Sequence, residues 1–308
     1  MNVRALPDAA WLGFAISFLA ASPALAQDFP DDLAAREGAI RLDPVGPWNL
    51  DFGENRCRLT GLFGNEEEKH LLLIDQAAPG GAFGLTLAGS QMKAFYNAPR
   101  LSVGHRSGRP MRESDDHGHG LVEGFGNALI FTSFKLGDSK GSSTDSADEG
   151  PSLWSAGIDL DAAGEAARIV VAKGETVVSF ETGNLAEPLQ ALNICTSDLL
   201  TQWGLDAEKH RAYAPPEWTN QKYIVRRIMQ TYSDEALLRG EMAVFRMRVI
   251  IGLDGTVEDC HLERSTEAKH LDPTVCREMR RARFKPARDA TGAPMRSFYA
   301  TTITYAMN

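Results

Sequence analysis

The sequence lacks the short motifs that mark several common enzyme classes. It contains no phosphate-binding G-x-x-x-x-G-K-[ST] loop and no dinucleotide-binding G-x-G-x-x-G loop. Its four cysteines form no C-x-x-C pair, which argues against a zinc site or a thioredoxin-like redox site. No nucleophile stands beside an evident base. We therefore expect neither catalysis, nor a cofactor, nor a bound metal ion.

Positive charge is outnumbered by negative charge, with 32 Lys and Arg against 41 Asp and Glu. The formal net charge at pH 7 is −9 over 308 residues. Residues 221–308 carry 15 Lys and Arg against 11 Asp and Glu, whereas residues 1–220 carry 17 against 30. This asymmetry suggests two modules with different surfaces, and most of the chain would repel phosphates. We therefore expect no nucleic-acid partner.

One basic segment, Arg280 to Arg288, is the exception, with five positive charges in nine residues. Its first two arginines fall in the last turn of a predicted helix, where cations meet the negative end of the helix dipole. Further along, Phe284 would point inward between two cations, and no aromatic platform for stacking bases is interleaved. We interpret the segment as a solvated face of the fold.

Long apolar runs are absent after the first 26 residues. Within them, a weakly basic start is followed by the run AAWLGFAISFLAA and by the small-residue ending Ala24-Leu25-Ala26. This order is typical of a cleaved secretory signal peptide and predicts a periplasmic protein. The alternative is an uncleaved inner-membrane anchor, because residues 9–26 could barely span a bilayer.

The four cysteines fit an oxidising compartment. They allow three pairings, and the division of the chain into two modules favours Cys57–Cys195 and Cys260–Cys276. Each disulfide would then staple one module, and the shorter loop would contribute roughly 3 kcal/mol. Four free thiols are the alternative if the chain is not exported.

Residues 48–205 have the pattern of a mostly antiparallel β sandwich or barrel, after a loosely packed lead-in over residues 27–47. Short apolar runs alternate with breaks that carry the Gly and Asn required in turns. Residues 137–150 lack apolar anchors and are expected to form a flexible loop. The eight runs predicted to be strands are WNLDF, CRLTGLF, HLLLID, FGLTLAG, ALIFTSF, SLWSAGI, ARIVVA and TVVSFET.

A helix closes this β-rich domain. Over residues 188–205, Leu189, Leu192 and Leu199 recur at helical spacing, and Gly204 ends the pattern. Residues 206–221 are polar with a double proline and are expected to link the two modules.

The C-terminal module, residues 222–308, has the sharper pattern. Phe245, Met247, Val249 and Ile251 alternate with charged residues, as in a strand with one buried face. Asp254-Gly255 then predicts a tight hairpin turn. A helix near Cys276 and a final strand follow, so the fold class expected for the whole chain is α+β.

These features resemble the C-terminal domain of TonB, the periplasmic end of the outer-membrane energy transducer. The resemblance covers Gln230 to Tyr305, about a quarter of the chain. It is carried by the turn Asp254-Gly255, by Arg283-Phe284-Lys285-Pro286 and by Gly292-Ala293-Pro294, in that order and spacing. The family implies a small α+β domain, in which a helix packs on a three-stranded antiparallel sheet.

The resemblance also implies a binding mode, because the family adds a short receptor segment to the edge of its sheet. An open edge supplies backbone hydrogen bonds with little demand on sequence. The candidate edge is the last strand, and the expected partner is an envelope protein such as an outer-membrane receptor. A homodimer by sheet pairing is a further option. The candidate binding residues are Ser297, Tyr299, Thr301, Ile303, Tyr305 and Gln230.

The best metal candidate in the β-rich domain is the run from Asp115 to Gly120, with His105 nearby. His117 and His119 would face the same way in a strand, beside carboxylates. The glycines of this run indicate a loop instead, and no third ligand of recognisable spacing is present. We expect a solvated polar turn here.

Three functions therefore stay open. The first is an exported, periplasmic binding protein, because no Pro-rich repeat is present that could form the extended spacer of a transducer. The second is a ligand-binding or metal-dependent enzyme domain that the TonB-like domain localises. The third is an energy transducer that keeps its N-terminal anchor.

Overall fold

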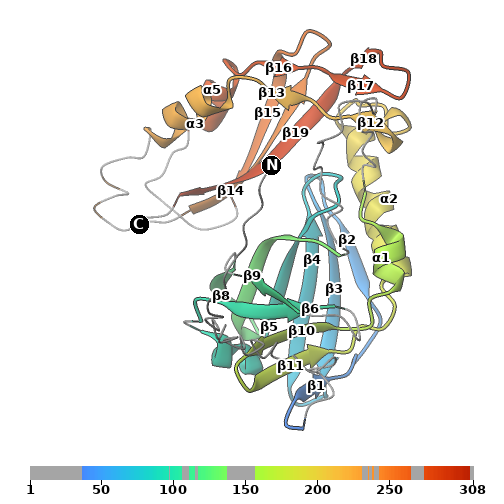
Figure 1. Ribbon diagram of the computed structural model, residues 1–308, viewed down its shortest axis with the longest axis vertical. Coiled ribbons are helices and arrows are strands. Elements are labelled where there is room, and N and C mark those ends of the chain that lie inside the picture. The colour runs from blue at the N-terminus through green and yellow to red at the C-terminus, as the bar shows by residue number, and fades with distance from the viewer. Residues whose placement is uncertain are drawn as a thin grey trace, which may run out of the picture.

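Six strands form the larger sheet of the N-terminal module (Figure 1). Each strand pairs antiparallel with its neighbours, in the order β2-β3-β4-β5-β9-β8. Alternate residues of β3 are buried, as the period of a half-buried strand requires. The strands are β2 (Asn49–Phe52), β3 (Cys57–Gly64), β4 (Lys69–Gln76), β5 (Phe83–Ala88), β8 (Gly118–Val122) and β9 (Gly126–Phe134).

The computed structural model describes only part of the chain. The leader predicted over residues 1–26, the loop predicted over residues 137–150 and nearly all of the strand predicted over residues 152–158 lie outside it. The described residues are 37–96, 98–105, 111–114, 117–136, 157–230, 235, 238, 243–264 and 274–305.

A second, five-stranded sheet packs across the first. Its order is β1-β11-β10-β6-β7, and only β1 pairs parallel, with β11. Figure 1 shows its strands running across those of the larger sheet, as in an orthogonal β sandwich. The strands are β1 (Ile40–Leu42), β6 (Leu101–Gly104), β7 (Arg112–Ser114), β10 (Ile169–Lys173) and β11 (Thr176–Phe180).

One hydrophobic core joins the two sheets to a helix. Leu59 and Ile74 from the larger sheet share a cluster with Val178 from the smaller sheet and Leu192 from α2 (Ala186–Gln202). The helix ends as predicted, because Gly204 adopts a φ of +71°, which a residue with a side chain rarely takes. Two short helices, η2 (Ser90–Phe95) and α1 (Leu160–Gly164), complete this module.

Residues 206–221, expected to link the modules, are built into the fold. They form η3 (Lys209–Arg211), β12 (Tyr213–Ala214) and β13 (Glu217–Trp218). β12 pairs with β17 (Ala287–Asp289), which also pairs with β18 (Pro294–Met295), and β13 pairs with β16 (Phe284–Lys285). The segment therefore adds two short strands to the C-terminal module.

The C-terminal module is a three-stranded antiparallel sheet covered by helices, and the α+β fold class predicted from the sequence is confirmed. The order is β15-β14-β19, with β14 in the centre. Helices α3 and α5 cover one face of the sheet (Figure 1). The elements are α3 (Gln221–Met229), β14 (Ala243–Ile251), β15 (Val257–Arg264), α5 (Val275–Met279) and β19 (Ser297–Tyr305).

Both modules carry the disulfide proposed for them. Cys57 on β3 is bonded to Cys195 on α2, and Cys260 on β15 is bonded to Cys276 on α5. No described cysteine is free. Each bond therefore ties a helix to the sheet on which it packs.

Candidate functional site

The centre of the candidate site is the pair of long strands β14 and β19. They pair over nine residues, from Ala243 opposite Tyr305 to Ile251 opposite Ser297. β15 covers the other side of β14, so among the described strands β19 is an outer strand of this sheet. An outer strand presents unpaired backbone N–H and C=O groups, which can pair with another chain.

One face of this sheet carries the hydrophobic core of the C-terminal module. The residues of β14 that the sequence predicted to be buried contact side chains from both helices. On α5, Glu278 is 3% exposed and forms ion pairs with Arg227 of α3 and with Arg281. The hydrogen bond from Arg227, with the one from Arg281, lowers the pKa of Glu278 to about 2. The buried carboxylate therefore stays charged and joins α3 to α5. The core residues from β14 are Phe245, Met247, Val249 and Ile251.

An aromatic cluster fixes β19 to this core. Phe284 stacks on Trp218 with 5.6 Å between ring centroids, and Tyr299 of β19 lies edge-on to Trp218 at 5.4 Å. Burial raises the pKa of Tyr299. The hairpin turn reaches the same cluster, because the backbone N–H of Phe284 donates to the carbonyl of Gly255. The Phe of the Arg-Phe-Lys-Pro run is thus a structural anchor.

The predicted binding residues on β19 point mainly into the protein. Ser297 is fully buried, and its Oγ lies 2.9 Å from Nε2 of His210. Tyr299 and Ile303 pack against the core, and Thr301 is half-buried. Tyr305 ends the strand opposite Ala243. The side chains of Ser297, Tyr299 and Ile303 hold β19 in place, so a partner strand would meet chiefly the backbone of its edge.

Gln230 lies apart from these residues. It follows α3, is exposed, and its backbone N–H donates to the carbonyl of Arg226. Among the described residues, no interaction joins Gln230 to β19. A role for Gln230 in binding a partner therefore stays a prediction.

The opposite face of the sheet packs on the N-terminal module. The guanidinium of Arg248 lies over the ring of Trp203, 4.0 Å from its centroid, and burial lowers the pKa of Arg248. Phe298 contacts Trp203 edge-on at 5.7 Å and His210 at 5.8 Å. Ile250 belongs to the same small core. Sequence periodicity predicted the arginines of β14 on a face away from the core, without any signal that a second module covers it.

Two ion pairs extend this contact. Arg246 of β14 pairs with Asp75 of β4 at 2.5 Å, and Arg56 pairs with Glu263 of β15 at 3.4 Å. Burial raises the pKa of Asp75, and the positive charge of Arg246 opposes that rise. The two modules are therefore joined by apolar packing at Trp203 and by charge pairs nearer β4.

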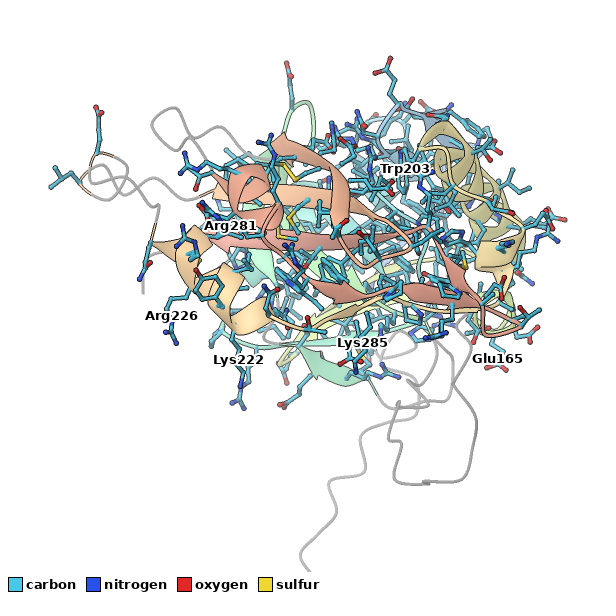
Figure 2. All side chains as sticks on the ribbon, turned by 90° about the horizontal axis from the view of Figure 1, so that it is seen from above. Glu165, Trp203, Lys222, Arg226, Arg281 and Lys285 are labelled. Atoms are coloured by element: carbon cyan, nitrogen blue, oxygen red, sulfur yellow. A yellow bond between two sulfur atoms is a disulfide. The ribbon has the colours of Figure 1, made fainter. Side chains whose placement is uncertain are left out.

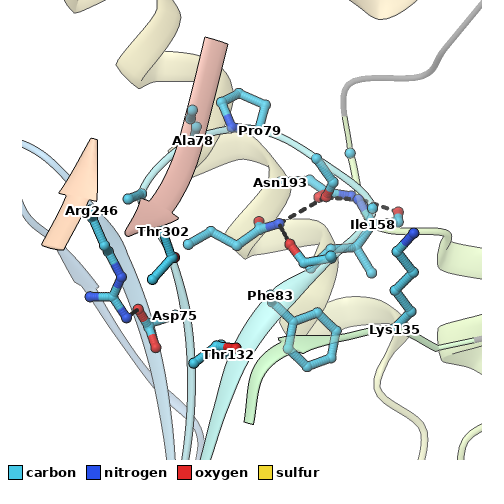
Figure 3. Close-up of a pocket in the computed structure, with 18 of the residues that line it drawn as sticks. Asp75, Ala78, Pro79, Phe83, Thr132, Lys135, Ile158, Asn193, Arg246 and Thr302 are labelled. Atoms are coloured by element: carbon cyan, nitrogen blue, oxygen red, sulfur yellow. Dashed lines mark hydrogen bonds and ion pairs between the residues drawn. The ribbon is translucent and has the colours of Figure 1, made fainter. Parts of the chain in front are cut away.

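Between these contacts the modules enclose a cleft of about 1120 Å³ beside β19 (Figure 3). Figure 3 shows Arg246 and Thr302 on neighbouring strands, with Asn193, Ile158 and Lys135 across the cleft from Thr302. Phe83 and Thr132 form its floor in this view. No sequence motif indicated this site, because its two walls come from segments of the chain that are at least 53 residues apart, the separation of Asn193 and Arg246.

The basic segment Arg280 to Arg288 is largely engaged within the protein. Arg281 binds Glu278, Lys285 binds Glu217 at 2.8 Å, and Arg288 donates to the carbonyl of Gly292. Figure 2 shows Arg281 and Lys285 well apart on the surface. Because α5 ends at Met279, the first two arginines follow the helix and do not form its last turn as expected.

The histidine run of the β-rich domain is a strand where a loop was expected. Gly118–Val122 forms β8, which pairs with β9 and leaves Gly120 against Ile130. His117 and His119 lie edge to face, with 5.4 Å between ring centroids, and burial lowers the pKa of His119. Asp115 lies outside the described residues, and within these no group of three metal-binding side chains occurs.

One further run in the sequence has the pattern of an enzyme motif that was not predicted above. Residues 137–141, Gly-Asp-Ser-Lys-Gly, have the spacing of a G-x-S-x-G nucleophile turn. That motif needs a strand before it and a helix directly after it. β9 precedes the run, the run itself lies outside the described residues, and the next described helix, α1, begins only at Leu160. The spacing alone supports no catalytic role.

Comparison with known proteins identifies one segment. Residues 229–307 match the protein family described as Gram-negative bacterial TonB protein C-terminal, and this segment runs from the end of α3 through β19. No curated protein and no solved structure shows a match to the chain. Within the described residues, no helix has the length and apolar character needed to cross a membrane.

Proposed function

We propose, because residues 229–307 belong to the TonB C-terminal domain family, that this protein binds a cell-envelope protein by strand addition to β19. The family is one of interaction domains, without enzymatic activity, in envelope energy transduction. The single observation that carries the proposal is the place of β19 at the outside of the sheet β15-β14-β19. The expected partner is a segment of an outer-membrane receptor, and the binding would support transport across the outer membrane.

The way β19 is held supports this binding mode. Tyr299 of β19 packs against Trp218 and Phe284, so the strand does not need to order when a partner arrives. Its backbone on the outer side supplies the hydrogen-bonding groups, and each such bond contributes about 1 kcal/mol net. A pre-ordered edge of nine residues can therefore bind an extended segment with useful affinity.

Strand addition is tested with labelled ten-residue peptides that cover the periplasm-facing segments of outer-membrane receptors. A peptide that binds is remade in two forms, N-methylated at its odd or at its even positions. Because alternate N–H groups of a strand point to opposite sides, only one form should lose binding, by at least tenfold. Equal loss by both forms, equal retention by both, or no binding peptide at all would refute the proposal.

The protein is further proposed to act in the periplasm after removal of residues 1–26. Cell fractionation and sequencing of the mature N-terminus test this. A periplasmic chain that begins at Gln27 is the expected result. An inner-membrane chain that begins at Met1 would show an anchor instead, and would favour a membrane-bound transducer.

The same edge can pair with β19 of a second copy. Sedimentation velocity at increasing protein concentration would detect such a homodimer. If β19 forms the contact, the receptor peptide should compete with it and return the chain to a monomer.

A further inference from the structure

The cleft beside β19 has a second wall that belongs to the N-terminal module. β14 and β19 contribute Arg246, Thr301 and Thr302, while Lys135 and Asn193 come from the far side. In Figure 3 the far side lies beyond β19, away from β14. The lining also includes His261 and Glu263 of β15, so the cleft opens along one face of the whole sheet. A strand added to β19 would continue that face, and its side chains on this face would point into the cleft.

We infer that the N-terminal module forms the second half of the partner site and selects an extended peptide with apolar or small side chains and a basic residue. The inference rests on the proposed strand addition. It assigns to the β-rich domain a role in recognising the side chains of the segment whose backbone β19 binds.

The shape of the second wall suits an extended segment. The turn between β4 and β5 is held by Gln76, whose Nε2 donates to the carbonyls of Gly80 and Ala82 at 2.8 Å each. Asn193 holds Ile158 by two hydrogen bonds, of 2.9 and 3.0 Å. Both parts of the wall are therefore ordered before a ligand arrives, which lowers the entropic cost of binding.

A polar atom of this wall lacks a partner. Gln76 is 3% exposed, lines the cleft, and its Oε1 has no hydrogen-bond partner among the described residues. A buried acceptor without a partner is costly, so a donor from a bound segment would stabilise it. The backbone N–H groups of an added peptide are such donors.

The rest of the lining sets the chemistry of the ligand. Apolar side chains from Phe83, Leu136 and Ile158 favour apolar or small groups on the peptide. The lining also carries five carboxylates against three Lys or Arg. Asp75 and Glu263 are paired with arginines, whereas Asp161 of α1 is exposed. A basic side chain in the peptide therefore complements the cleft better than an acidic one.

The test uses the full chain and a receptor peptide with one basic residue, together with its Lys-to-Glu counterpart, in fluorescence anisotropy. Thr132→Trp fills the cleft, and Ser133→Trp places the same side chain on the neighbouring exposed position outside the lining. Asp161→Lys reverses a charge of the cleft, and Asp198→Lys does so on an exposed position of α2 outside it. Circular dichroism verifies that each variant is folded.

We expect Thr132→Trp to weaken the basic peptide at least tenfold and Asp161→Lys to weaken it roughly threefold to fivefold, while both controls bind as the unmodified chain. The acidic peptide should respond to Asp161→Lys in the opposite direction. Unchanged binding in all four variants would refute the role of the N-terminal module in the partner site. The proposal of strand addition to β19 would not be affected. If the peptide does not bind the unmodified chain, both the proposal of strand addition and the inference that rests on it are refuted.

Discussion

The two disulfides should contribute unequally to stability, because they close loops of different length. Cys57 and Cys195 are separated by 138 residues, whereas Cys260 and Cys276 are separated by 16. A cross-link stabilises mainly by restricting the unfolded chain, and its effect grows with the logarithm of the loop length. The long loop is then worth about 5 kcal/mol and the short loop about 3 kcal/mol.

The perturbation is a pair of double variants, Cys57→Ala with Cys195→Ala and Cys260→Ala with Cys276→Ala. Urea unfolding followed by circular dichroism and tryptophan fluorescence gives the free energy of unfolding of each. The first variant should lose about 2 kcal/mol more than the second. Its m-value should also rise, because the released chain of 138 residues exposes more surface when unfolded.

Burial of the sulfur atoms is a second effect that must be separated from the cross-link. Cys57 and Cys195 are 0% and 2% exposed, so their truncation also leaves a cavity. Reduced wild-type protein in dithiothreitol keeps all four sulfur atoms and lacks only the bonds. It therefore gives the combined effect of the two cross-links without a cavity, and the excess loss in the double variants measures the cavities. If the two double variants lose equal stability, or if the short loop matters more, the entropic reasoning is refuted.

Three further predictions concern single residues. Gly255 has a φ of +78°, and a Cβ there would lie 1.8 Å from the carbonyl oxygen of Phe284, whereas Gly292 has a φ of +85° and open space around it. Gly292→Ala should therefore cost about 1 kcal/mol in urea unfolding, and Gly255→Ala at least twice that; equal losses would contradict the close contact. Burial lowers the pKa of His210, so its contribution to stability is complete above the unfolded value of 6.5 and falls as the pH drops towards the lower folded value. His210→Gln should remove that part of the pH dependence of unfolding, and identical pH profiles would contradict the argument. The pKa of Glu278 is lowered to about 2 from 4.5, so its stabilisation is complete above pH 4.5 and is lost as the pH falls towards 2. Glu278→Gln should flatten the acid limb of the stability curve between these values, and an unchanged limb would show that the pairs with Arg227 and Arg281 contribute nothing.

The strands that alternate strongly in hydrophobicity could be predicted from the sequence, and the weakly patterned ones could not. β3, β4 and β14 carry apolar residues at every second position or in runs, and each lies where it was predicted. β7 has three residues without a buried side chain, and β8 contains two glycines. Such strands are specified by their neighbours β6 and β9, and not by their own side chains.

The candidate site also consists of a part that could be predicted from the sequence and a part that could not. The edge strand could be located because Asp254-Gly255 and the Phe284 run fix the order of elements in the C-terminal module. The wall opposite β19 had no such signal, since Asn193, Lys135 and Thr302 become neighbours only through the docking of the two modules.

That docking changes the meaning of the alternating pattern in β14. A strand with apolar residues on one side and arginines on the other predicts a sheet with one face in water. Here Arg246 forms an ion pair with Asp75, and the guanidinium of Arg248 lies over the ring of Trp203. The charged face is therefore an internal contact between the two modules. Long arginine side chains serve both settings, because their stems bury apolar surface while their guanidinium groups bind carboxylates or aromatic faces. Periodicity therefore identifies which side chains share a face, but it does not identify what that face meets. In this chain, the second face of the C-terminal sheet meets the N-terminal module.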